Sequence, residues 1–543
     1  MPPAPPSRLL RVNGAADWFL TSEERGNPAS AVDRRNPDET AWTEHNRVRP
    51  LIHGRMYFKR MVPCLRELKR GDRLWFTDWR GDDDQVLSAD GTRLGDLLVQ
   101  LATEGVEIRG LLWRSHSKAI GYHAERHVAL AERVNEAGGQ LLLDERVRRA
   151  GSHHQKMVIL RHPGRSELDV AFVGGIDLCH GRGDDRAHRG DPQPEEMDPA
   201  YGPTPPWHDV QSEVRGPAVG DIAFTFWERW NDLTPLDRRT PWNRVRRILG
   251  RQPVRPEPIG SLDPDPPPAG KAEVQVLRTY PAKTPPSPFA LDGERSIARE
   301  YHKAFQRARR LVYVEDQYLW SAEVADLYVQ ALRRHQDLHI IAVVPRVPDR
   351  NGGFTGPAHR IGQLEVLDSV REAADGRMAV YDLENELGTP IYVHAKVVVV
   401  DDVLAAVGSD NMNRRSWTHD SECSLAVLDD ERDERSPSDP AGLGDGARAF
   451  ARRLRLELMR EHLGVDCDDG LIDPGEAFAA FARSAQALDA WHRSGKIGPR
   501  PPGRLRPHHL RELHPWEVWA QPLYRTLVDP DGRPRQLRRA RAF

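Results

Sequence analysis

The segment YVHAKVVVVDD, residues 392–402, places a histidine and a lysine two positions apart at the start of a run of valines. Because alternate side chains of a β-strand share one face, His394 and Lys396 should project from the same side of a sheet. Lysine is rare in this chain, with nine among 78 lysines and arginines, so a lysine inside an apolar strand needs a reason. An imidazole can serve as nucleophile or general acid, and an ammonium group can stabilise developing negative charge.

The same pattern occurs a second time, in HHQKMVIL at residues 153–160. If two halves of the chain pack about a pseudo-twofold axis, His154 and Lys156 would meet His394 and Lys396 in one site. Such a site suits phosphodiester chemistry. One neutral imidazole attacks phosphorus to form a phosphohistidine, and the other, protonated, gives its proton to the leaving alkoxide. Two ammonium groups would supply the electrostatic stabilisation that a metal supplies elsewhere, so we expect neither a metal nor a cofactor.

Each imidazole then needs a carboxylate on its far ring nitrogen, which fixes the tautomer and raises the pKa of the ring. Asp209 in WHDV and Asp420 in THDSE stand at equivalent places in the two halves, and we predict that they orient the two histidines. The sequence does not say which aspartate serves which histidine. Glu422 lies two positions after Asp420 and should face the same way, where it either supports the site or pairs with an arginine.

Five sequence blocks recur in the same order, 211 to 240 residues apart, so the chain reads as two copies of one unit. The paired blocks are LWFTDW (74–79) and LVYVED (311–316), VEIRGLLWR (106–114) and LHIIAVVPR (338–346), HHQKMVIL (153–160) and VHAKVVVV (393–400), AFVGGIDL (171–178) and AAVGSDNM (405–412), and WHDVQSEV (207–214) and THDSECSL (418–425). We therefore predict an N-terminal half, a Pro-rich linker, a C-terminal half and a C-terminal extension, at residues 1–250, 251–270, 271–499 and 500–543.

Short apolar runs alternate with amphipathic helical segments in both halves. This alternation predicts an α/β fold: two tandem, pseudo-twofold-related α/β sandwich halves, each a mixed β-sheet flanked by helices, with the active site at their interface. The polar segment 181–206 lies outside the repeat. It is either a rim or lid loop of the site or a plain surface loop.

Composition narrows the function classes. With 543 residues the chain is long enough for two domains, and its net charge of -3 gives no basic excess for binding nucleic acid. The four cysteines show no CxxC spacing, which argues against zinc and against a disulfide framework. The sequence has no apolar run long enough for a signal peptide or a membrane span, so we expect a cytoplasmic protein that is at most peripheral to a membrane. We also expect a monomer.

These patterns resemble the phospholipase D superfamily, over residues 50 to 465 or thereabouts. The matching positions are His394, Lys396 and Asp401 for its His-x-Lys-x4-Asp motif, Gly408, Ser409, Asp410 and Asn411 for the Gly-Ser-x-Asn that follows, and His154, Lys156, Gly174, Gly175 and Asp177 in the first half. Three further segments, YVEDQYL (313–319), IYVHAK (391–396) and LYRTLVDPDGRP (523–534), are similar to its phospholipid-cleaving branch.

The resemblance implies that His154 is the nucleophile and that His394 is the acid and base. It assigns the contacts with the substrate phosphate to Ser409, Asn411, Gly174, Gly175, Asp177 and Glu422, and a structural role to Asp401 and Gly408. Two positions depart from the family pattern. Arg161 stands where the first motif has its aspartate, and Asp169 is the candidate for its structural place. Asp177 replaces an expected asparagine and should alter the phosphate contacts of that half.

The leading hypothesis is a phospholipase D that hydrolyses the headgroup phosphodiester of a phospholipid at a membrane surface. An alcohol in place of water would give transphosphatidylation. The alternatives are a phosphatidyltransferase similar to cardiolipin or phosphatidylserine synthases, a nuclease, and an inactive scaffold, which Arg161 makes conceivable. The near-neutral charge and the two motifs in one chain weigh against the nuclease, so we expect no nucleic-acid partner.

Overall fold

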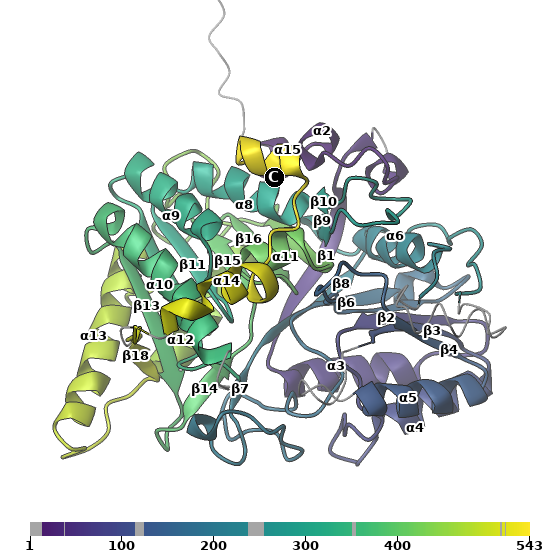
Figure 1. The fold of residues 1–543 in the computed structure, drawn as a ribbon, viewed down its shortest axis with the longest axis horizontal. Helices are drawn as coiled ribbons and strands as arrows, with labels where there is room; N and C mark the ends of the chain where they lie inside the picture. Colours follow the sequence, from purple (N-terminus) through teal and green to yellow (C-terminus); the bar gives the residue numbers. More distant parts are fainter. Residues whose placement is uncertain are drawn as a thin grey trace, which may run out of the picture.

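The computed structural model describes residues 14–36, 39–114, 124–236, 255–349, 355–510, 513–515 and 517–543. Two α/β halves lie side by side, the N-terminal one in purple and blue and the C-terminal one in teal to yellow (Figure 1). Each half contains a mixed sheet with helices packed on it, which confirms the predicted fold class.

The sheet of the N-terminal half has the first His-x-Lys segment next to one of its central strands. In spatial order its strands are β1 (Thr43–Ile52), β8 (Val210–Arg215), β6 (Val170–Gly174), β5 (Met157–Arg161), β2 (Arg73–Asp78), β3 (Glu107–Trp113) and β4 (Gln140–Asp144). The last three run parallel, and the other pairs are antiparallel. Every residue of β5 is buried, as expected for a strand covered on both faces.

The sheet of the C-terminal half repeats this order. Its strands are β9 (Ala272–Tyr280), β17 (Glu422–Asp429), β16 (Leu404–Gly408), β15 (Val397–Val400), β11 (Leu311–Glu315), β12 (His339–Val343) and β13 (Met378–Glu384). Short strand β10 (Glu294–Arg295) pairs with the end of β9, and β18 (Leu505–Pro507) from the C-terminal extension adds to β13. The position of β15 therefore corresponds to that of β5.

Helices cover the outer face of each sheet and fill the space between the sheets. The outer helices are α3 (Gly54–Arg66), α4 (Leu94–Glu104) and α5 (Ala124–Glu136) on the N-terminal sheet, and α8 (Ser296–Arg307), α9 (Ala322–Arg334) and α10 (Thr355–Ala374) on the C-terminal sheet. A third apolar cluster joins both sheets through α6 (Ala218–Trp230), α12 (Ala449–Leu463) and α13 (Pro474–Arg493). This shared core fixes the position of one half relative to the other.

The two halves also exchange backbone hydrogen bonds at their seam. Strand β1 pairs with β9, which links the two sheets. Strand β7 (Trp207–His208) of the first half pairs in parallel with β14 (Pro390–Val393) of the second. The reciprocal contact is a parallel bridge between His153 and Ser421. Each histidine motif is therefore anchored to the opposite half of the chain.

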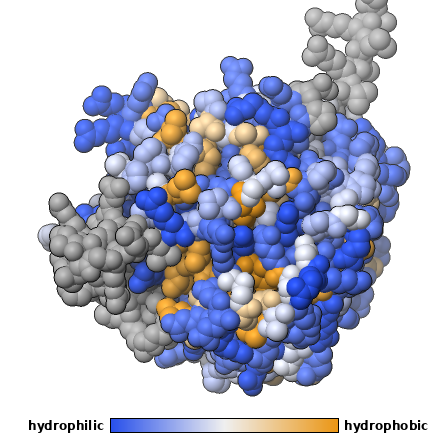
Figure 2. Space-filling view, turned by 90° about the vertical axis from the view of Figure 1, so that its right-hand side faces the viewer, coloured by the Kyte–Doolittle hydropathy of each residue, from blue (hydrophilic) through white to orange (hydrophobic). Residues whose placement is uncertain are grey.

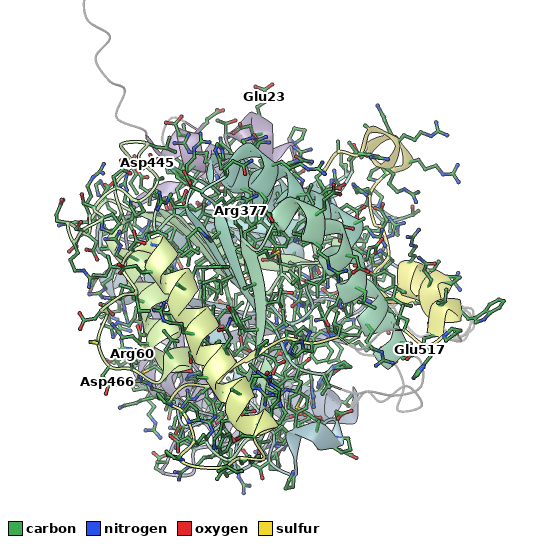
Figure 3. All side chains as sticks on the ribbon, turned by 90° about the vertical axis from the view of Figure 1, so that its left-hand side faces the viewer. Glu23, Arg60, Arg377, Asp445, Asp466 and Glu517 are labelled. Carbon is green, nitrogen blue, oxygen red and sulfur yellow. The ribbon has the colours of Figure 1, made fainter. Side chains whose placement is uncertain are left out.

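The remaining short elements lie near the ends of the chain and at the seam. They are α1 (Ala15–Trp18), α2 (Ser22–Arg25), η1 (Asp33–Arg35), η4 (Ser166–Leu168), η5 (Pro199–Tyr201), α11 (Arg414–Thr418), η6 (Glu517–Ala520), α14 (Gln521–Leu523), the π-helical η7 (Tyr524–Val528) and α15 (Arg535–Ala540). Glu517 of the C-terminal extension, labelled in Figure 3, forms an ion pair with Arg360 of α10. The extension thus packs on the C-terminal half and contributes a strand to its sheet.

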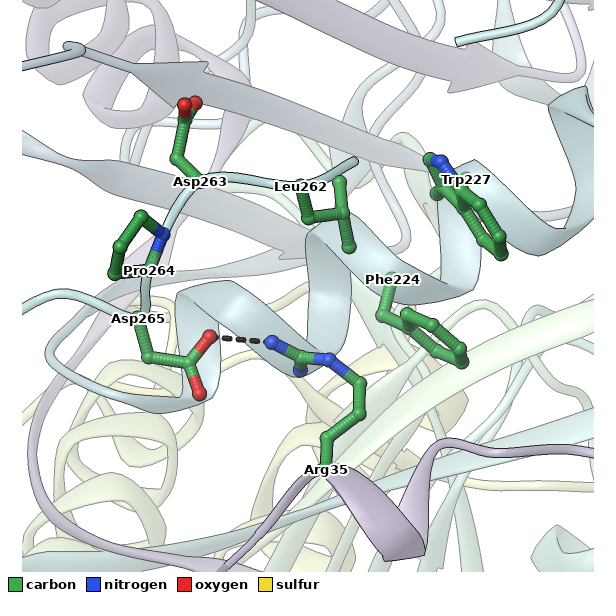
Figure 4. Close-up of a pocket in the computed structure, with 7 residues that line it drawn as sticks. All are labelled: Arg35, Phe224, Trp227, Leu262, Asp263, Pro264 and Asp265. Carbon is green, nitrogen blue, oxygen red and sulfur yellow. Dashed lines mark hydrogen bonds and ion pairs between the residues drawn. The ribbon is translucent and has the colours of Figure 1, made fainter. Parts of the chain in front are cut away.

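The described part of the linker, from residue 255, has no regular secondary structure and contacts the N-terminal half, where the carbonyl oxygens of Glu257 and Ile259 accept from Nε1 of Trp230 and Nδ2 of Asn231. Residues 262–265 border a hollow of about 430 Å³ over α6 (Figure 4). Its lining consists of Arg35, Phe224, Trp227, Leu262, Asp263, Pro264 and Asp265. An ion pair between Arg35 and Asp265 crosses it. None of the residues predicted to act on phosphate lines this hollow, so it has no part in the proposed chemistry.

Figure 2 shows one face, on which apolar residues form scattered patches between hydrophilic ones. Among the described residues, no helix combines the length and the apolar character that crossing a bilayer requires.

Candidate active site at the seam between the halves

Backbone hydrogen bonds across the seam position both motif histidines. The N–H of His394, just after β14, donates to the carbonyl oxygen of His208 at 2.8 Å. The N–H of His154 donates to the carbonyl oxygen of Ser421 at 2.9 Å. Neither half alone can hold its histidine in this way, so the site forms only when the halves pack together.

Asp209 orients the ring of His394. Its Oδ2 lies 2.7 Å from Nδ1 of His394, so Nδ1 carries the proton and Nε2 keeps a lone pair when the ring is neutral. The carboxylate is itself held, because it accepts hydrogen bonds from Nε1 of Trp207 at 3.2 Å and from the N–H of Val210 at 2.9 Å. The Trp207 ring also packs against the imidazole, with 4.9 Å between ring centroids.

Glu422, the first residue of β17, orients the ring of His154. Its Oε2 lies 2.9 Å from Nδ1 of His154. The Ser409 hydroxyl donates to the same oxygen at 2.6 Å and accepts from the N–H of Cys423 at 3.0 Å. Trp79 stands edge-on to the imidazole, with 6.1 Å between ring centroids. Each histidine therefore has a buried carboxylate and an indole beside it.

The prediction that Asp420 orients a histidine is wrong. Its carboxylate accepts from the N–H and the hydroxyl of Ser152, at 2.8 and 2.9 Å, and from Nε of Arg415 at 2.6 Å. It precedes β17 and secures the loop before His154, whereas Glu422 faces the imidazole. Glu422 therefore has the orienting role, which agrees with the predicted support of the site and not with the alternative of pairing with an arginine.

The two motif lysines lie beside the histidines and are buried. Nζ of Lys156 donates to the carbonyl oxygen of His154 at 3.1 Å and lies 3.4 Å from Oδ1 of Asp177. Nζ of Lys396 donates to the carbonyl oxygen of His394 and to Oε1 of Gln317, the latter at 3.3 Å. These contacts hold the ammonium groups in place, and an ammonium group has three protons to donate.

Burial dominates the electrostatics of the site. It lowers the pKa of both His154 and His394 well below the usual value, and the Lys156 and Lys396 charges lower both further. Burial also lowers the pKa of Lys396 to about 8 and raises that of Glu422 to about 8. An arriving phosphodiester brings negative charge, which opposes these shifts for the histidines and for Lys396.

Both imidazoles keep a small exposed fraction despite their burial. The side chain of His154 is 13% exposed and that of His394 is 7% exposed. Within the described residues, neither Nε2 atom has a hydrogen-bond partner, and each Nδ1 is taken by its carboxylate. A phosphorus centre can thus approach one Nε2 while the other transfers a proton.

Comparison with known proteins identifies the family. The family model described as Phospholipase D matches residues 82–240, and that described as Cardiolipin synthase, PLD-like domain, matches residues 301–434. The chain belongs to the phospholipase D superfamily. Its two matches fall one in each half, as the internal repeat requires.

Curated relatives and a solved structure agree with this membership. Phospholipase D alpha 2 of Oryza sativa subsp. japonica is 25% identical over 582 residues, covering 81% of this chain and 67% of the relative. Phospholipase D alpha 1 of Carica papaya is 25% identical over 531 residues, covering 74% and 63%. The chain thus spans about two thirds of the length of these plant relatives. The crystal structure of phosphatidylserine synthase from Haemophilus influenzae Rd KW20 shares the fold, with a TM-score of 0.50 and 13% identity over 83% of this chain and 93% of that one.

The aspartate of the superfamily motif is present in the second half only. Asp401, just after β15, accepts from the N–H groups of Arg309, Arg310 and Leu311 at 2.7 to 2.8 Å and so ties β15 to the start of β11. In the first half, Nε of Arg161 donates to Oδ2 of Asp169 at 2.7 Å. This pair closes the turn after β5, at the end of the strand away from His154, and leaves the catalytic motif intact.

Asp177 is the counterion of Lys156 rather than a free phosphate ligand. Burial opposes its charge, but the Lys156 and Arg182 charges outweigh burial and hold its pKa below the usual value. It also accepts from the N–H groups of Trp79 and Arg80, at 3.1 and 3.2 Å. An ionised carboxylate would repel a phosphate oxygen, so the predicted phosphate contact of Asp177 does not fit this arrangement.

The predicted glycines provide space for the carboxylates and strands. A Cβ on Gly175 would overlap Oδ1 of Asp209, and one on Gly174 would lie 2.5 Å from Oε1 of Gln211. A Cβ on Gly408 would overlap Ser424. Their role in the structure is close approach between neighbouring strands. Asn411 is buried, and within the described residues its Oδ1 has no hydrogen-bond partner.

Arg182, at the start of the 181–206 insertion, is a site residue that the sequence analysis missed. Its guanidinium packs on the ring of Trp207, 3.8 Å from the ring centroid, and is buried. Its charge lowers the pKa of His394. The insertion therefore builds part of the site. No sequence motif marks this arginine, because only the folded loop brings it to Trp207.

Proposed function

We propose that the protein is a phospholipase D that hydrolyses glycerophospholipid headgroup phosphodiesters and transfers the phosphatidyl group to alcohols. The observation that supports this most is the pair of histidines at the seam, each with a carboxylate on Nδ1 and an Nε2 that has no hydrogen-bond partner among the described residues. Two buried lysines add positive charge beside them. This set of groups performs phosphodiester cleavage without a metal in the reacting centre.

The first half-reaction transfers the phosphatidyl group to the protein. Nε2 of His154 attacks phosphorus, and a phosphorus–nitrogen bond forms as the bond to the headgroup oxygen breaks. The imidazolium of His394 gives its Nε2 proton to the leaving alkoxide, while Asp209 balances the positive charge that this ring carries beforehand. Lys156 and Lys396 stabilise the charge on the non-bridging oxygens.

The second half-reaction regenerates the protein. Water or an alcohol attacks phosphorus and gives its proton to Nε2 of His394, which now acts as the base. The phosphorus–nitrogen bond breaks and returns the electron pair to His154. Water yields phosphatidate, and a primary alcohol yields the corresponding phosphatidyl alcohol. No redox partner is required.

A lipid panel with and without ethanol tests the proposal. Purified protein on phosphatidylcholine vesicles should release choline and form phosphatidate, and with ethanol should form phosphatidylethanol. The variant His394→Asn should form neither. Acid quenching during turnover should trap a phosphoprotein, and peptide mapping should place the phosphoryl group on residue 154. Turnover of plasmid DNA without lipid turnover would refute the proposal in favour of a nuclease.

A phosphatidyltransferase is the second candidate, because residues 301–434 match the model described as Cardiolipin synthase, PLD-like domain. It would use the same two half-reactions with a lipid alcohol or an amino-acid hydroxyl as acceptor. Vesicles that contain phosphatidylglycerol separate the candidates. Cardiolipin as the main product would favour the transferase, and phosphatidate as the main product would favour the hydrolase.

A further inference from the structure

A cluster of buried imidazoles lies at the seam, next to Asp209. His53 precedes α3, His188 lies in the 181–206 insertion, His208 ends β7, and Glu461 lies in α12 of the opposite half. Each residue is at most 4% exposed. One nitrogen or oxygen atom from each lies within 4.8 Å of those of all the others. The catalytic mechanism uses none of these four side chains.

The spacing of these atoms is close to that of a tetrahedral metal site. Glu461 lies 2.9 Å from Nε2 of His53, 2.9 Å from Nε2 of His188 and 3.5 Å from Nδ1 of His208. Four ligands about 2.0 Å from a central zinc ion would stand about 3.3 Å from one another. Small side-chain movements would therefore convert the cluster into a coordination sphere.

The far nitrogens of two imidazoles face carboxylates. Nε2 of His208 lies within hydrogen-bond distance of Glu315, at 2.6 Å, whereas Nδ1 of His188 lies 3.7 Å from Asp184 and forms no hydrogen bond among the described residues. Histidine ligands of metals usually donate their second ring N–H to a carboxylate in this way, which directs the lone pair of the other nitrogen at the metal. Nδ1 of His208, the nitrogen that points into the cluster, is buried and has no hydrogen-bond partner among the described residues.

The backbone conformation of two of these histidines independently supports a ligand site at the cluster. His53 and His188 both have left-handed backbones, with φ of 69° and 51°. Such conformations are unfavourable for residues other than glycine and persist where the surroundings impose them, often at ligand sites. Both residues turn their side chains toward the same carboxylate.

We propose that His53, His188, His208 and Glu461 bind a zinc ion that joins the two halves. Three imidazoles and a carboxylate are donors that zinc accepts, and a site closed by four protein ligands is typical of a structural rather than a catalytic ion. The charge also balances. A divalent ion and Arg504, 3.5 Å from Glu461, would offset the carboxylates of Glu461, Glu315 and Asp184.

The ion would position the catalytic histidine without touching the substrate. The carbonyl oxygen of His208 accepts from the N–H of His394, and the N–H of His53 donates to the carbonyl oxygen of Asp209 at 2.8 Å. Fixing both imidazoles to Glu461 would hold Asp209 in place, between β7 and β8. The cysteine spacing that argued against zinc does not bear on this site, whose ligands come from four distant segments.

Metal analysis of the intact protein tests the proposal. Wild-type protein from zinc-supplied cells should contain about one zinc ion per chain, and Glu461→Gln and His188→Gln should contain almost none. His492→Gln is the matched control, because it removes an imidazole from a separate histidine–glutamate pair, in which Nε2 of His492 lies 2.7 Å from Glu384. It should keep its zinc.

Wild-type protein alone provides the second measurement, in case the variants do not fold. After a strong chelator has removed the metal, zinc should raise the midpoint of thermal unfolding by about 3 °C or more. Cobalt should give the visible spectrum of a tetrahedral ion without the charge-transfer band of a thiolate ligand. A folded, metal-free wild type that shows neither response, or a folded Glu461→Gln that retains full zinc, would overturn the proposal and leave a hydrogen-bonded cluster only.

Discussion

Replacing Glu422 with glutamine tests the orienting role that the structure gives this residue. Glutamine has nearly the same shape, and its amide oxygen can still accept from Nδ1 of His154 and from Ser409. What disappears is the carboxyl group 2.9 Å from the ring, which can carry a negative charge where an amide cannot, although burial raises its pKa to about 8. That charge matters because His154 becomes positively charged when its Nε2 attacks phosphorus.

The expected loss follows from the strength of that contact. A hydrogen bond to a charged group contributes about 1.5–3 kcal/mol, roughly twice a neutral one. Glutamine keeps a neutral hydrogen bond, so about half of this energy, roughly 0.75–1.5 kcal/mol, is lost. If that loss falls mainly on the transition state, the rate of the chemical step falls about 4- to 13-fold. If the amide instead turns its NH₂ group toward Nδ1, the ring takes the wrong tautomer, and the loss approaches the roughly 10⁴-fold seen when the analogous carboxylate of a serine protease becomes an amide.

Asp420→Asn is the matched control, since it makes the same chemical change two residues away. Asp420 binds Ser152 and Arg415 and does not contact an imidazole. Its variant should lower the thermal unfolding midpoint and leave the single-turnover rate within a few-fold of wild type. Single-turnover cleavage of phosphatidylcholine, measured beside thermal unfolding, separates the two effects. The reasoning fails if Asp420→Asn slows turnover as much as Glu422→Gln does, or if Glu422→Gln is as fast as wild type.

Three further predictions concern the same site. His154→Asn and His394→Asn should each lower kcat by several orders of magnitude, and the double variant should be little worse than either, because the two rings act as a unit; additive losses would contradict a shared step. Burial lowers the pKa of Lys396 to about 8, so kcat/KM should fall as the pH rises through 8 and the ammonium group loses its proton. Any activity of Lys396→Arg should lack this fall at high pH, because arginine keeps its charge. If the variant shows the same fall, another group causes the pH dependence. Gly175→Ala should impair activity, because its methyl group would displace the carboxylate that orients His394, whereas Gly260→Ala, which meets nothing within 4 Å, should behave as wild type in both turnover and unfolding assays.

Much of the fold could be predicted because it depends on periodicity and repetition. Five paired blocks and their alternation with helical segments were enough to predict two α/β halves, and the comparisons and the structure agree with that fold. The extension at residues 500–543 was predicted only as a segment that follows the second half, yet its strand β18 joins the sheet of the C-terminal half. Its sequence is rich in proline and arginine, and only three residues form the strand, so periodicity gave no signal there.

The sequence predicted the types of the catalytic residues better than it predicted which carboxylate contacts which histidine. Aligning WHDV with THDSE made Asp209 and Asp420 look equivalent. The two halves differ two positions later, where the first half has Gln211 and the second has Glu422. Gln211 accepts from the N–H of Ile176 at 3.2 Å, whereas Glu422 accepts from His154. The repeat is therefore symmetric in backbone and asymmetric in the carboxylates that serve the two imidazoles.

The sequence by itself determined which residue types could cleave a phosphodiester and on which face of a strand each His-x-Lys pair lies, because side chains alternate strictly along a strand. Only the tertiary structure decided which carboxylate meets which imidazole, that Arg182 reaches Trp207, and that His53, His188, His208 and Glu461 come together. Those contacts join segments from opposite halves or from an irregular loop. Their geometry depends on how two sheets pack across a seam, which no local pattern in the chain encodes.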